Sequence, residues 1–468
     1  MYEEQINAYF DDPSAEAALV EAVSRLVRIR SVREPAQPGK PFGAGPAEAL
    51  AEALTLAGEL GFATRNYENY VGTADLNDQE TLVHILGHLD VVGEGTGWTV
   101  TDPYIPKVVD GMLYGRGTDD DKGPLMAALF AMKAVRDLGI PLKHNARLIM
   151  GTDEESGSSD IAYYYAREPF APYTFSPDAE FPVINIEKGS YKPVFTKSWP
   201  ADARTPRVKS LKGGFRINVL PPEADAVVAG MDIASLEPYC AKVSDATGAV
   251  FTLSEEGEDV RLHCDGRGAH ASLPEEGNNA ITALLTLLCS LPLAQTASAA
   301  ALKALNALFP HGDCAGKALG IAQADEISGA LTLAFSLLEV TETGLEGRFD
   351  SRVPLCATDE NCRKAAEASF CKFGFSVSGE MEPPHHTPAD SPFVKTLLKC
   401  YEQYTGNQGA CLAIGGGTYV HDIPGGVAFG CGMPGFNGNM HGADEHLCIK
   451  DLLTSCKIFA QVIVDLCA

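Results

Sequence analysis

The amino-acid sequence predicts an α/β protein, with a main domain built on a central mixed sheet flanked by helices and an inserted α+β domain. Three observations predict this fold. The chain has 468 residues, well beyond the roughly 250 to 300 residues at which single hydrophobic cores stop growing. In its first part, short apolar runs typical of strands end at acidic or histidine-containing segments. Between about residues 190 and 382, the sequence changes to extended segments and turns.

Two apolar runs predict strands of the main domain. Residues Thr81 to Leu86 lead into Gly87-His88, and residues Ala146 to Met150 lead into a loop that contains Glu154-Glu155. In α/β enzymes, ligands bind at the carboxyl ends of strands. We therefore expect His88 and the two glutamates on strand-end loops.

Helices are predicted where apolar residues recur at helical spacing. One such segment runs from Pro124 to Val135, after Asp120-Asp121-Lys122-Gly123, and its proline suits a first helical position. Further helical stretches are predicted at Asn279–Leu291, Ala294–Ala307, Ile327–Leu338 and Pro392–Tyr404.

Five short segments carry histidine and acidic side chains in a pattern typical of a two-metal hydrolase. They are His88-Leu89-Asp90, Asp120-Asp121, Glu154-Glu155, Asp178 and His441. Imidazole nitrogen and carboxylate oxygen, without thiolate, suit zinc, manganese or cobalt in a catalytic site. Taken alone, each of these residues has a plainer interpretation. Each histidine would be an ordinary surface or core residue, the aspartates would form a solvated acidic turn, and the glutamates would begin a helix. Hydrolytic metal chemistry accounts for all five together.

The five segments also predict the domain boundaries. None of them lies in the middle block, whereas the C-terminal part returns with a helix, a Gly415-Gly416-Gly417-Thr418 loop and His441. The simplest organisation is a main domain formed by residues 1–189 and 383–468, with residues 190–382 inserted into it.

Charge restricts the partners. The formal net charge is −26, from 36 basic and 62 acidic residues. Such a chain repels polyanions and anionic membranes, so neither nucleic acid nor a membrane is expected as a partner. No apolar run approaches the roughly 18 residues of a membrane span. We expect a small-molecule substrate.

The cysteines indicate a reducing compartment. All 13 lie between Cys240 and Cys467, outside the five segments and without a Cys-x-x-Cys pair. The odd count, together with an N-terminus that lacks a basic stretch and an apolar core, argues against secretion and a disulfide framework. The expected compartment is therefore the cytosol.

Four motifs resemble a known family. They are GHLDVV from Gly87, GRGTDDDKG from Gly115, TDEESG from Thr152 and SPD from Ser176. They look like the M20 metallopeptidases, and specifically the bacterial dipeptidase V branch, which includes PepV-like and Sapep-like enzymes and dipeptidases of Xaa-His or carnosinase type. This resemblance implies a zinc-peptidase-type catalytic domain and an inserted lid domain.

The resemblance also implies ligands for two divalent cations, with zinc preferred over manganese or cobalt. His88, Asp120 and Asp178 would bind one ion. Asp120, Glu155 and His441 would bind the other, so that Asp120 bridges the pair. A cis peptide bond would follow Asp120.

Three further residues resemble the family's catalytic machinery. Glu154 would be the general base, and Asp90 would fix the His88 imidazole. In the inserted domain, His270 would polarise the scissile carbonyl and stabilise the oxyanion.

Substrate contacts are implied as well. Asn218 resembles a residue that binds the substrate backbone, and Arg352 resembles the arginine that takes the substrate carboxylate. Backbone N–H groups of the glycine loop, at Gly416 and Thr418, would face the same carboxylate. Each has a plainer alternative: Arg352 pairs with Asp350, and the glycine loop is a simple turn.

Together these resemblances imply a metal-dependent dipeptidase that hydrolyses free dipeptides. Aspartate rather than glutamate at position 178 is typical of the dipeptidase members, and the long inserted domain resembles the branch that works as a monomer. Asp119 and His421 depart from the family pattern. Two alternatives stay open: an N-acyl amino acid amidohydrolase or desuccinylase of the same family, and a non-catalytic peptide-binding protein.

Overall fold

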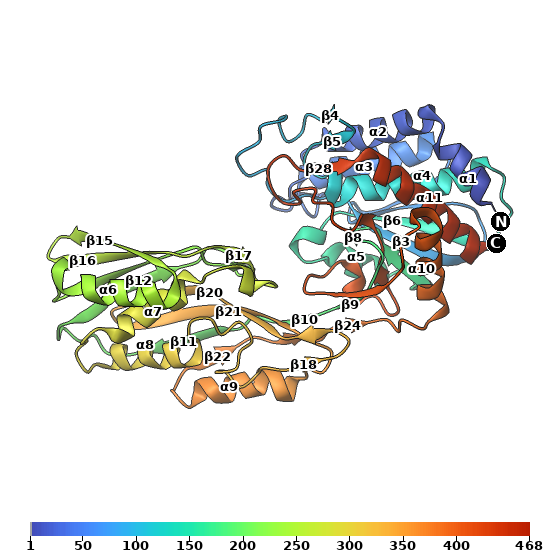
Figure 1. The fold of residues 1–468 in the computed structure, drawn as a ribbon. Helices are drawn as coiled ribbons and strands as arrows, with labels where there is room; N and C mark the ends of the chain where they lie inside the picture. The colour runs from blue at the N-terminus through green and yellow to red at the C-terminus, as the bar shows by residue number, and fades with distance from the viewer. Residues whose placement is uncertain (1) are drawn as a thin grey trace. The chain divides into compact units, whose positions relative to one another are not determined.

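The computed structural model describes residues 2–468, which form two compact units (Figure 1). The first unit comprises the chain up to Ile186 together with His386–Leu412 and Gly417–Ala468. The second comprises Glu187–His385 and Ala413–Gly416. Each unit has its own hydrophobic core.

A mixed sheet forms the centre of the first unit. Its strands follow the spatial order β1 (Ala63–Tyr67), β2 (Val71–Asp75), β6 (Asn145–Gly151), β3 (Thr81–His88), β7 (Tyr173–Ser176), β26 (Val427–Ala428), β9 (Val183–Glu187) and β24 (His385–His386), and β25 (Cys411–Ile414) pairs with β9 beside this path. The middle strand, β3, is parallel to both of its neighbours. Its residues from Val83 to His88 are all buried, which is typical of a parallel strand covered on both faces.

The helices of the first unit are α1 (Glu3–Phe10), α2 (Pro13–Val27), α3 (Ala44–Glu59), α4 (Gly123–Asp137), α5 (Ser159–Tyr165), α10 (Pro392–Thr405) and α11 (Ile449–Cys467). Helix α4 packs against α11 and is buried over most of its length. Short strands anchor the connecting loops: β4 (Lys107–Val109), β5 (Met112–Tyr114) and β28 (His446–Cys448) form one small sheet, and β8 (Ala179–Glu180) pairs with β27 (Cys431–Gly432).

The second unit is a large antiparallel sheet with helices packed on it. The sheet has ten strands, and its main path is β15 (Val250–Glu256), β16 (Asp259–Asp265), β14 (Glu223–Ala229), β12 (Arg207–Gly213), β20 (Thr332–Thr341), β21 (Gly344–Val353), β10 (Gly189–Tyr191) and β23 (Met381–Glu382). Strands β11 (Val194–Ser198) and β22 (Ser376–Ser378) lie beside this path. Helices α6 (Ile233–Thr247), α7 (Ala280–Ser290) and α8 (Ala297–Leu308) pack against its strands, and α9 (Lys364–Cys371) packs against β22.

Four short strands complete the second unit. Strand β13 (Val219–Leu220) pairs with β17 (Ala269–His270), and β18 (Ala324–Asp325) pairs with β19 (Gly329–Ala330). Strands β24 and β25, which belong to the central sheet of the first unit, include two of the points where the chain passes from one unit to the other.

The predicted fold class is confirmed, and one predicted helix is wrong. The helical predictions that begin at Pro124, Asn279, Ala294 and Pro392 correspond to α4, α7, α8 and α10. The stretch Ile327–Leu338 instead forms β19 and most of β20. Strand β20 is paired on one side with β21 and on the other with β12. These two pairings override the helical propensity of its Leu and Ala residues.

Among residues 2–468, no helix combines the length and the apolar character that a membrane crossing requires.

Candidate metal centre

Three of the predicted segments lie at the carboxyl ends of neighbouring strands. His88 is the last residue of β3, and Asp178 closely follows β7. Glu154 and Glu155 begin a short helical turn after β6. Because β6, β3 and β7 run in the same direction, these side chains emerge at the same edge of the sheet.

Asp120 and His441 reach this edge on loops. Asp120 lies in the turn Thr118–Lys122 before α4, and its peptide bond to Asp121 is cis, as expected. The chain around His441 is held by the parallel pairing of β27 with β8 and the antiparallel pairing of β28 with β5. The first unit therefore brings residues from both ends of the chain to one place.

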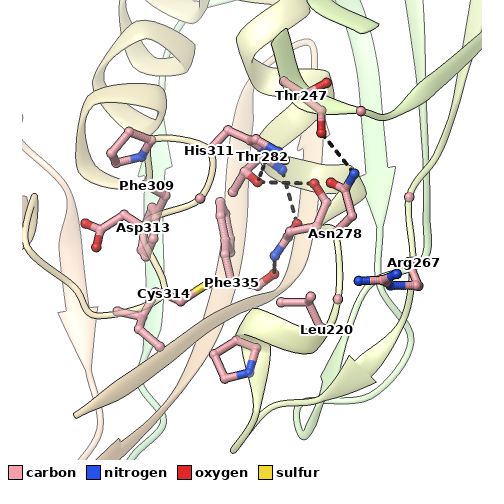
Figure 2. A pocket seen from close by; sticks show the side chains of 18 residues that line it. Leu220, Thr247, Arg267, Asn278, Thr282, Phe309, His311, Asp313, Cys314 and Phe335 are labelled. Carbon is pink, nitrogen blue, oxygen red and sulfur yellow. Dashed lines mark hydrogen bonds between the residues drawn. The ribbon is translucent and has the colours of Figure 1, made fainter. Parts of the chain in front are cut away.

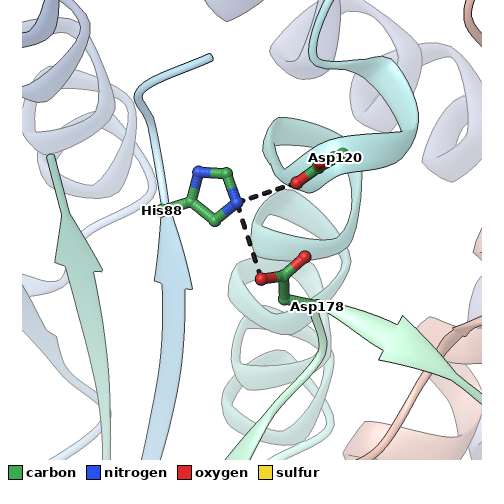
Figure 3. Close-up of side chains that lie close together, drawn as sticks. All are labelled: His88, Asp120 and Asp178. Carbon is green, nitrogen blue, oxygen red and sulfur yellow. Dashed lines mark hydrogen bonds and ion pairs between the residues drawn. The ribbon is translucent and has the colours of Figure 1, made fainter. Parts of the chain in front are cut away.

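The five predicted ligands form two adjoining groups that share Asp120. The Nε2 atom of His88 lies 2.8 Å from Asp120 Oδ1 and 3.6 Å from Asp178 Oδ2 (Figure 3). The Nε2 atom of His441 lies 2.8 Å from Asp120 Oδ2 and 3.1 Å from Glu155 Oε1. Within each group, one potential ligand atom per residue lies within 4.8 Å of the others. Each oxygen of Asp120 thus faces a different imidazole.

Burial and crowded negative charge shift the pKa values of this cluster. Burial would lower the pKa of His441, but the Asp120 and Glu155 carboxylates outweigh it and raise that pKa to about 10. Burial raises the pKa of Asp178 to about 7, helped by the negative charge of Asp120, although the positive charge of His88 acts to lower that pKa. Burial and the charge of Asp178 also raise the pKa of Glu154 well above its ordinary value.

These shifts fit a site for cations. Carboxylates that retain protons because they are buried near one another are stabilised in their ionised form by added positive charge. The donor set, two imidazole nitrogens and three carboxylates with one carboxylate shared, suits two divalent cations that prefer nitrogen and oxygen ligands.

Asp90 holds the loop that carries the two glutamates. Its Oδ1 accepts the backbone N–H of Glu154 at 3.1 Å, and its Oδ2 accepts that of Glu155 at 3.2 Å. The Nδ1 atom of His88 is 2.9 Å from the backbone oxygen of Asp90 but 3.5 Å from its Oδ1. The nearest partner of Nδ1 is therefore the Asp90 carbonyl rather than the expected carboxylate, because the carboxylate faces the two amides.

Comparison with known proteins identifies the family. The sequence matches the profile of Peptidase family M20/M25/M40 over residues 84–465. The chain belongs to this family. The resemblance inferred from the four motifs is confirmed.

Relatives of this M20 peptidase match it over nearly its whole length. The Bacillus subtilis (strain 168) protein YtjP, which carries a provisional dipeptidase name, is 36% identical over 456 residues, covering 96% of this chain and 97% of the relative. The Beta-Ala-Xaa dipeptidase of Lactobacillus delbrueckii subsp. lactis is 33% identical over 458 residues, covering 96% of each chain. The crystal structure of human carnosine dipeptidase 1 shares the fold, with a TM-score of 0.58 at 17% identity, covering 100% of this chain and 99% of that one.

Two buried carboxylates of this M20 peptidase organise the ligand loops and were not predicted from the sequence. The Oδ2 atom of Asp160 accepts the N–H groups of Thr152 and Asp153 and, at 2.6 Å, the hydroxyl of Tyr419. Glu445 accepts N–H groups of the Asp120 loop. In the sequence, neither position differs from an ordinary solvated acid, because no spacing rule marks a carboxylate that binds backbone amides.

The remaining predicted residues lie mostly in the second unit. His270 pairs with Val219 across β13 and β17, and the backbone oxygen of Asn218, which directly precedes β13, accepts the N–H of Ala271, so the two predicted residues lie close together. The Nδ1 of His270 is 2.6 Å from the hydroxyl of Ser272.

Arg352 and the glycine loop make contacts within the second unit. Arg352 is largely buried and donates to Asp350 at 2.8 and 2.9 Å, so the plainer pairing is present. A third donor of the guanidinium reaches the carbonyl of Gly415, next to Gly416. Thr418 belongs to the first unit, where its hydroxyl accepts the N–H of Val420.

A separate cavity of about 390 Å³ lies in the second unit (Figure 2). Asn278, Thr282, His311 and Phe335 are among the residues that line it. None of the predicted site residues belongs to its lining.

Proposed function

We propose that this M20 peptidase is a metal-dependent dipeptidase that hydrolyses the peptide bond of free dipeptides. The observation that carries the proposal is the pair of histidine–carboxylate groups that share Asp120, with Glu154 adjoining Glu155. The dipeptidase names of the two relatives, at 36% and 33% identity, support the substrate class.

The ligand assignments follow from the two groups. His88, Asp120 and Asp178 would hold one divalent cation, and Asp120, Glu155 and His441 would hold the other. Zinc is the proposed metal, with manganese and cobalt as the alternatives that the same donors accept. When bound, two such ions lower the pKa of a shared water to about 7 and polarise the scissile carbonyl.

Glu154 would move the proton. Its carboxylate has no hydrogen-bond partner among residues 2–468, so it is free to accept a proton from the attacking water. Burial, together with the charge of Asp178, raises its pKa well above the ordinary value, which suits a group that takes a proton and then donates it to the leaving amine. Asp90 would keep this carboxylate in place through the N–H groups of the same loop.

The second unit would supply recognition. We assign residues 190–382 as a lid on a catalytic domain formed by residues 1–189 and 383–468. His270 would donate a hydrogen bond to the carbonyl oxygen as negative charge develops there, and Asn218 would bind the substrate backbone. Arg352, with the backbone at Gly416 and Thr418, would bind the substrate carboxylate.

Asp178 or its neighbours would face the ammonium group at the other end of the substrate. A free ammonium group and a free carboxylate would therefore both be required. We further propose a monomer in the cytosol, in keeping with 13 free cysteines.

A substrate panel tests the proposal. Apo protein is reconstituted separately with Zn²⁺, Mn²⁺ or Co²⁺ and assayed on free dipeptides, their N-acetylated forms, tripeptides and N-acyl amino acids. We expect metal-dependent cleavage of free dipeptides and poor cleavage of the others. Faster cleavage of N-acyl amino acids would favour the amidohydrolase alternative. Binding of dipeptides without turnover under any of the three metals would favour a non-catalytic protein.

A further inference from the structure

A fully buried ion pair lies beside the proposed metal ligands. The Nη1 atom of Arg116 is 2.6 Å from Glu445 Oε2, and both side chains are only 1% exposed. Arg116 precedes Asp120 by four residues, and Glu445 follows His441 by four residues. The pair therefore joins the two loops that bring Asp120 and His441 to the edge of the sheet.

Glu445 shapes the Asp120 loop. Its Oε1 atom accepts three hydrogen bonds, from the backbone N–H groups of Gly117 at 2.9 Å, Asp119 at 3.0 Å and Asp120 at 3.2 Å. Gly117 has a φ of 84°, a left-handed conformation that glycine adopts readily and that turns its N–H towards the same oxygen as the others. One carboxylate oxygen thus fixes the backbone that carries Asp120.

Arg116 shapes the His441 loop. Its Nη2 atom donates to the backbone carbonyls of Gly442 at 3.0 Å and His441 at 3.4 Å. His441 has a φ of 62°, a left-handed conformation that residues with a side chain rarely adopt. Such a conformation persists only where the surroundings hold it. The guanidinium holds the two successive backbone carbonyls of His441 and Gly442, and so helps to orient the His441 imidazole towards Asp120.

The other ligands do not depend on this pair. His88 ends β3 and Asp178 follows β7, both anchored by the central sheet. Glu155 is positioned by Asp90. Within the Asp120, Glu155 and His441 group, however, two of three members stand on loops that the pair connects.

We propose that Arg116 and Glu445 are a positioning pair that assembles the Asp120, Glu155 and His441 group and thereby sets its affinity for a divalent cation. The inference rests on the proposed function, since it assumes that this group binds an ion. It adds that a charge pair outside the ligand set controls one ion more strongly than the other. A buried ion pair contributes little net stability against an apolar replacement. Control of the metal group would explain its place at the junction of the two loops.

Two variants separate positioning from folding. Arg116→Lys keeps the buried charge but loses the planar fork that reaches Glu445 and the loop carbonyls together. The double variant Arg116→Gln with Glu445→Gln removes both charges, so that neither is left unpaired. A matched control is Asp75→Asn with Arg147→Gln, which neutralises another ion pair of the first unit, 2.8 Å long, between β2 and β6.

The readout is metal affinity beside stability. Apo protein is titrated with Zn²⁺ against a chromophoric chelator, and thermal unfolding of the apo form is followed by circular dichroism. Loss of partners that orient metal ligands typically weakens metal affinity by about 10- to 100-fold. In both Arg116 variants we expect a roughly 10- to 100-fold weaker affinity for the ion held by the Asp120, Glu155 and His441 group. The affinity for the other ion should change much less. The control should keep both affinities, and Arg116→Lys should unfold near the wild-type temperature.

Each outcome decides the inference. Wild-type affinity for both ions in either Arg116 variant would overturn it. Equal weakening of both ions, or weakening in the control, would reduce the pair to a general structural role. A wild-type protein that binds two ions but cleaves no dipeptide would refute the proposed function and leave the positioning pair intact. A wild-type protein that binds fewer than two ions would overturn both.

Discussion

The sharpest test of the proposed chemistry is the exchange of Glu154 for glutamine. The change keeps the shape of the side chain and removes its ability to take a proton. Because no hydrogen bond holds the Glu154 carboxylate among residues 2–468, the exchange should cost little stability. Asp90 still accepts the N–H of residue 154, so the loop should keep its position. Loss of a general base typically costs 10²- to 10⁴-fold in turnover, or about 3 to 5 kcal/mol in activation free energy.

The assay pairs turnover with metal content. Steady-state hydrolysis of a free dipeptide gives kcat, and elemental analysis of the dialysed protein gives the number of bound ions. Glu154→Gln should bind two ions and lose at least about 100-fold in kcat. The adjacent Glu155→Gln is the matched control, because Glu155 contacts His441 at 3.1 Å, and this variant should lose an ion as well as activity. Kcat above one-tenth of the wild-type value in a Glu154→Gln protein with both ions would refute the reasoning.

Three further predictions follow from particular contacts. Asp120→Ala should abolish binding of both ions, because the two oxygens of Asp120 each face one histidine; retention of one tight ion, measured by Zn²⁺ titration, would contradict a shared ligand. Saturating Zn²⁺ should raise the unfolding temperature of the apo protein, since an ion that binds only the folded state stabilises it; an unchanged temperature would argue against a site. Burial, with the nearby Arg147, lowers the pKa of His84 to about 3, so the unfolded state binds the extra proton and stability should fall as pH drops from about 6.5 towards 3, by up to ~1.4 kcal/mol per unit. His84→Asn should flatten that slope in urea unfolding measured between pH 4 and 7, and an unchanged slope would assign the acid sensitivity to other groups.

Many residues of the proposed metal centre could be predicted because local sequence patterns indicate where they lie. An apolar run that stops at His88, or at the glutamates after β6, marks a strand end, and strand ends of parallel neighbours share one edge of a sheet. Asp120 is identifiable from its place before a helix, and the role of His441 only from the family resemblance, because its neighbours in sequence are turn residues. The sequence therefore predicted which side chains meet.

The rest of the centre depends on contacts that no local pattern encodes. Glu445 serves the Asp120 loop across more than 300 residues of sequence, and the same holds for Arg116 and Gly442. Asp160 likewise joins Thr152 to Tyr419 across a long separation. The helix predicted at Ile327–Leu338 was wrong for the same reason. A run of Leu and Ala favours helix locally, and only the pairing of β20 with β12 and β21 makes it a strand.

The division between sheet-borne and loop-borne ligands has a consequence for how folding and metal binding are linked. His88, Glu155 and Asp178 are fixed once the central sheet forms, because each lies at a strand end. Asp120 and His441 come from loops that meet only when the C-terminal segment has paired with the rest of the first unit, β27 with β8 and β28 with β5. Completion of the metal groups therefore requires the first unit as a whole. An ion that binds the completed groups would stabilise every contact needed to close them, so the proposed metal would link the two ends of the chain.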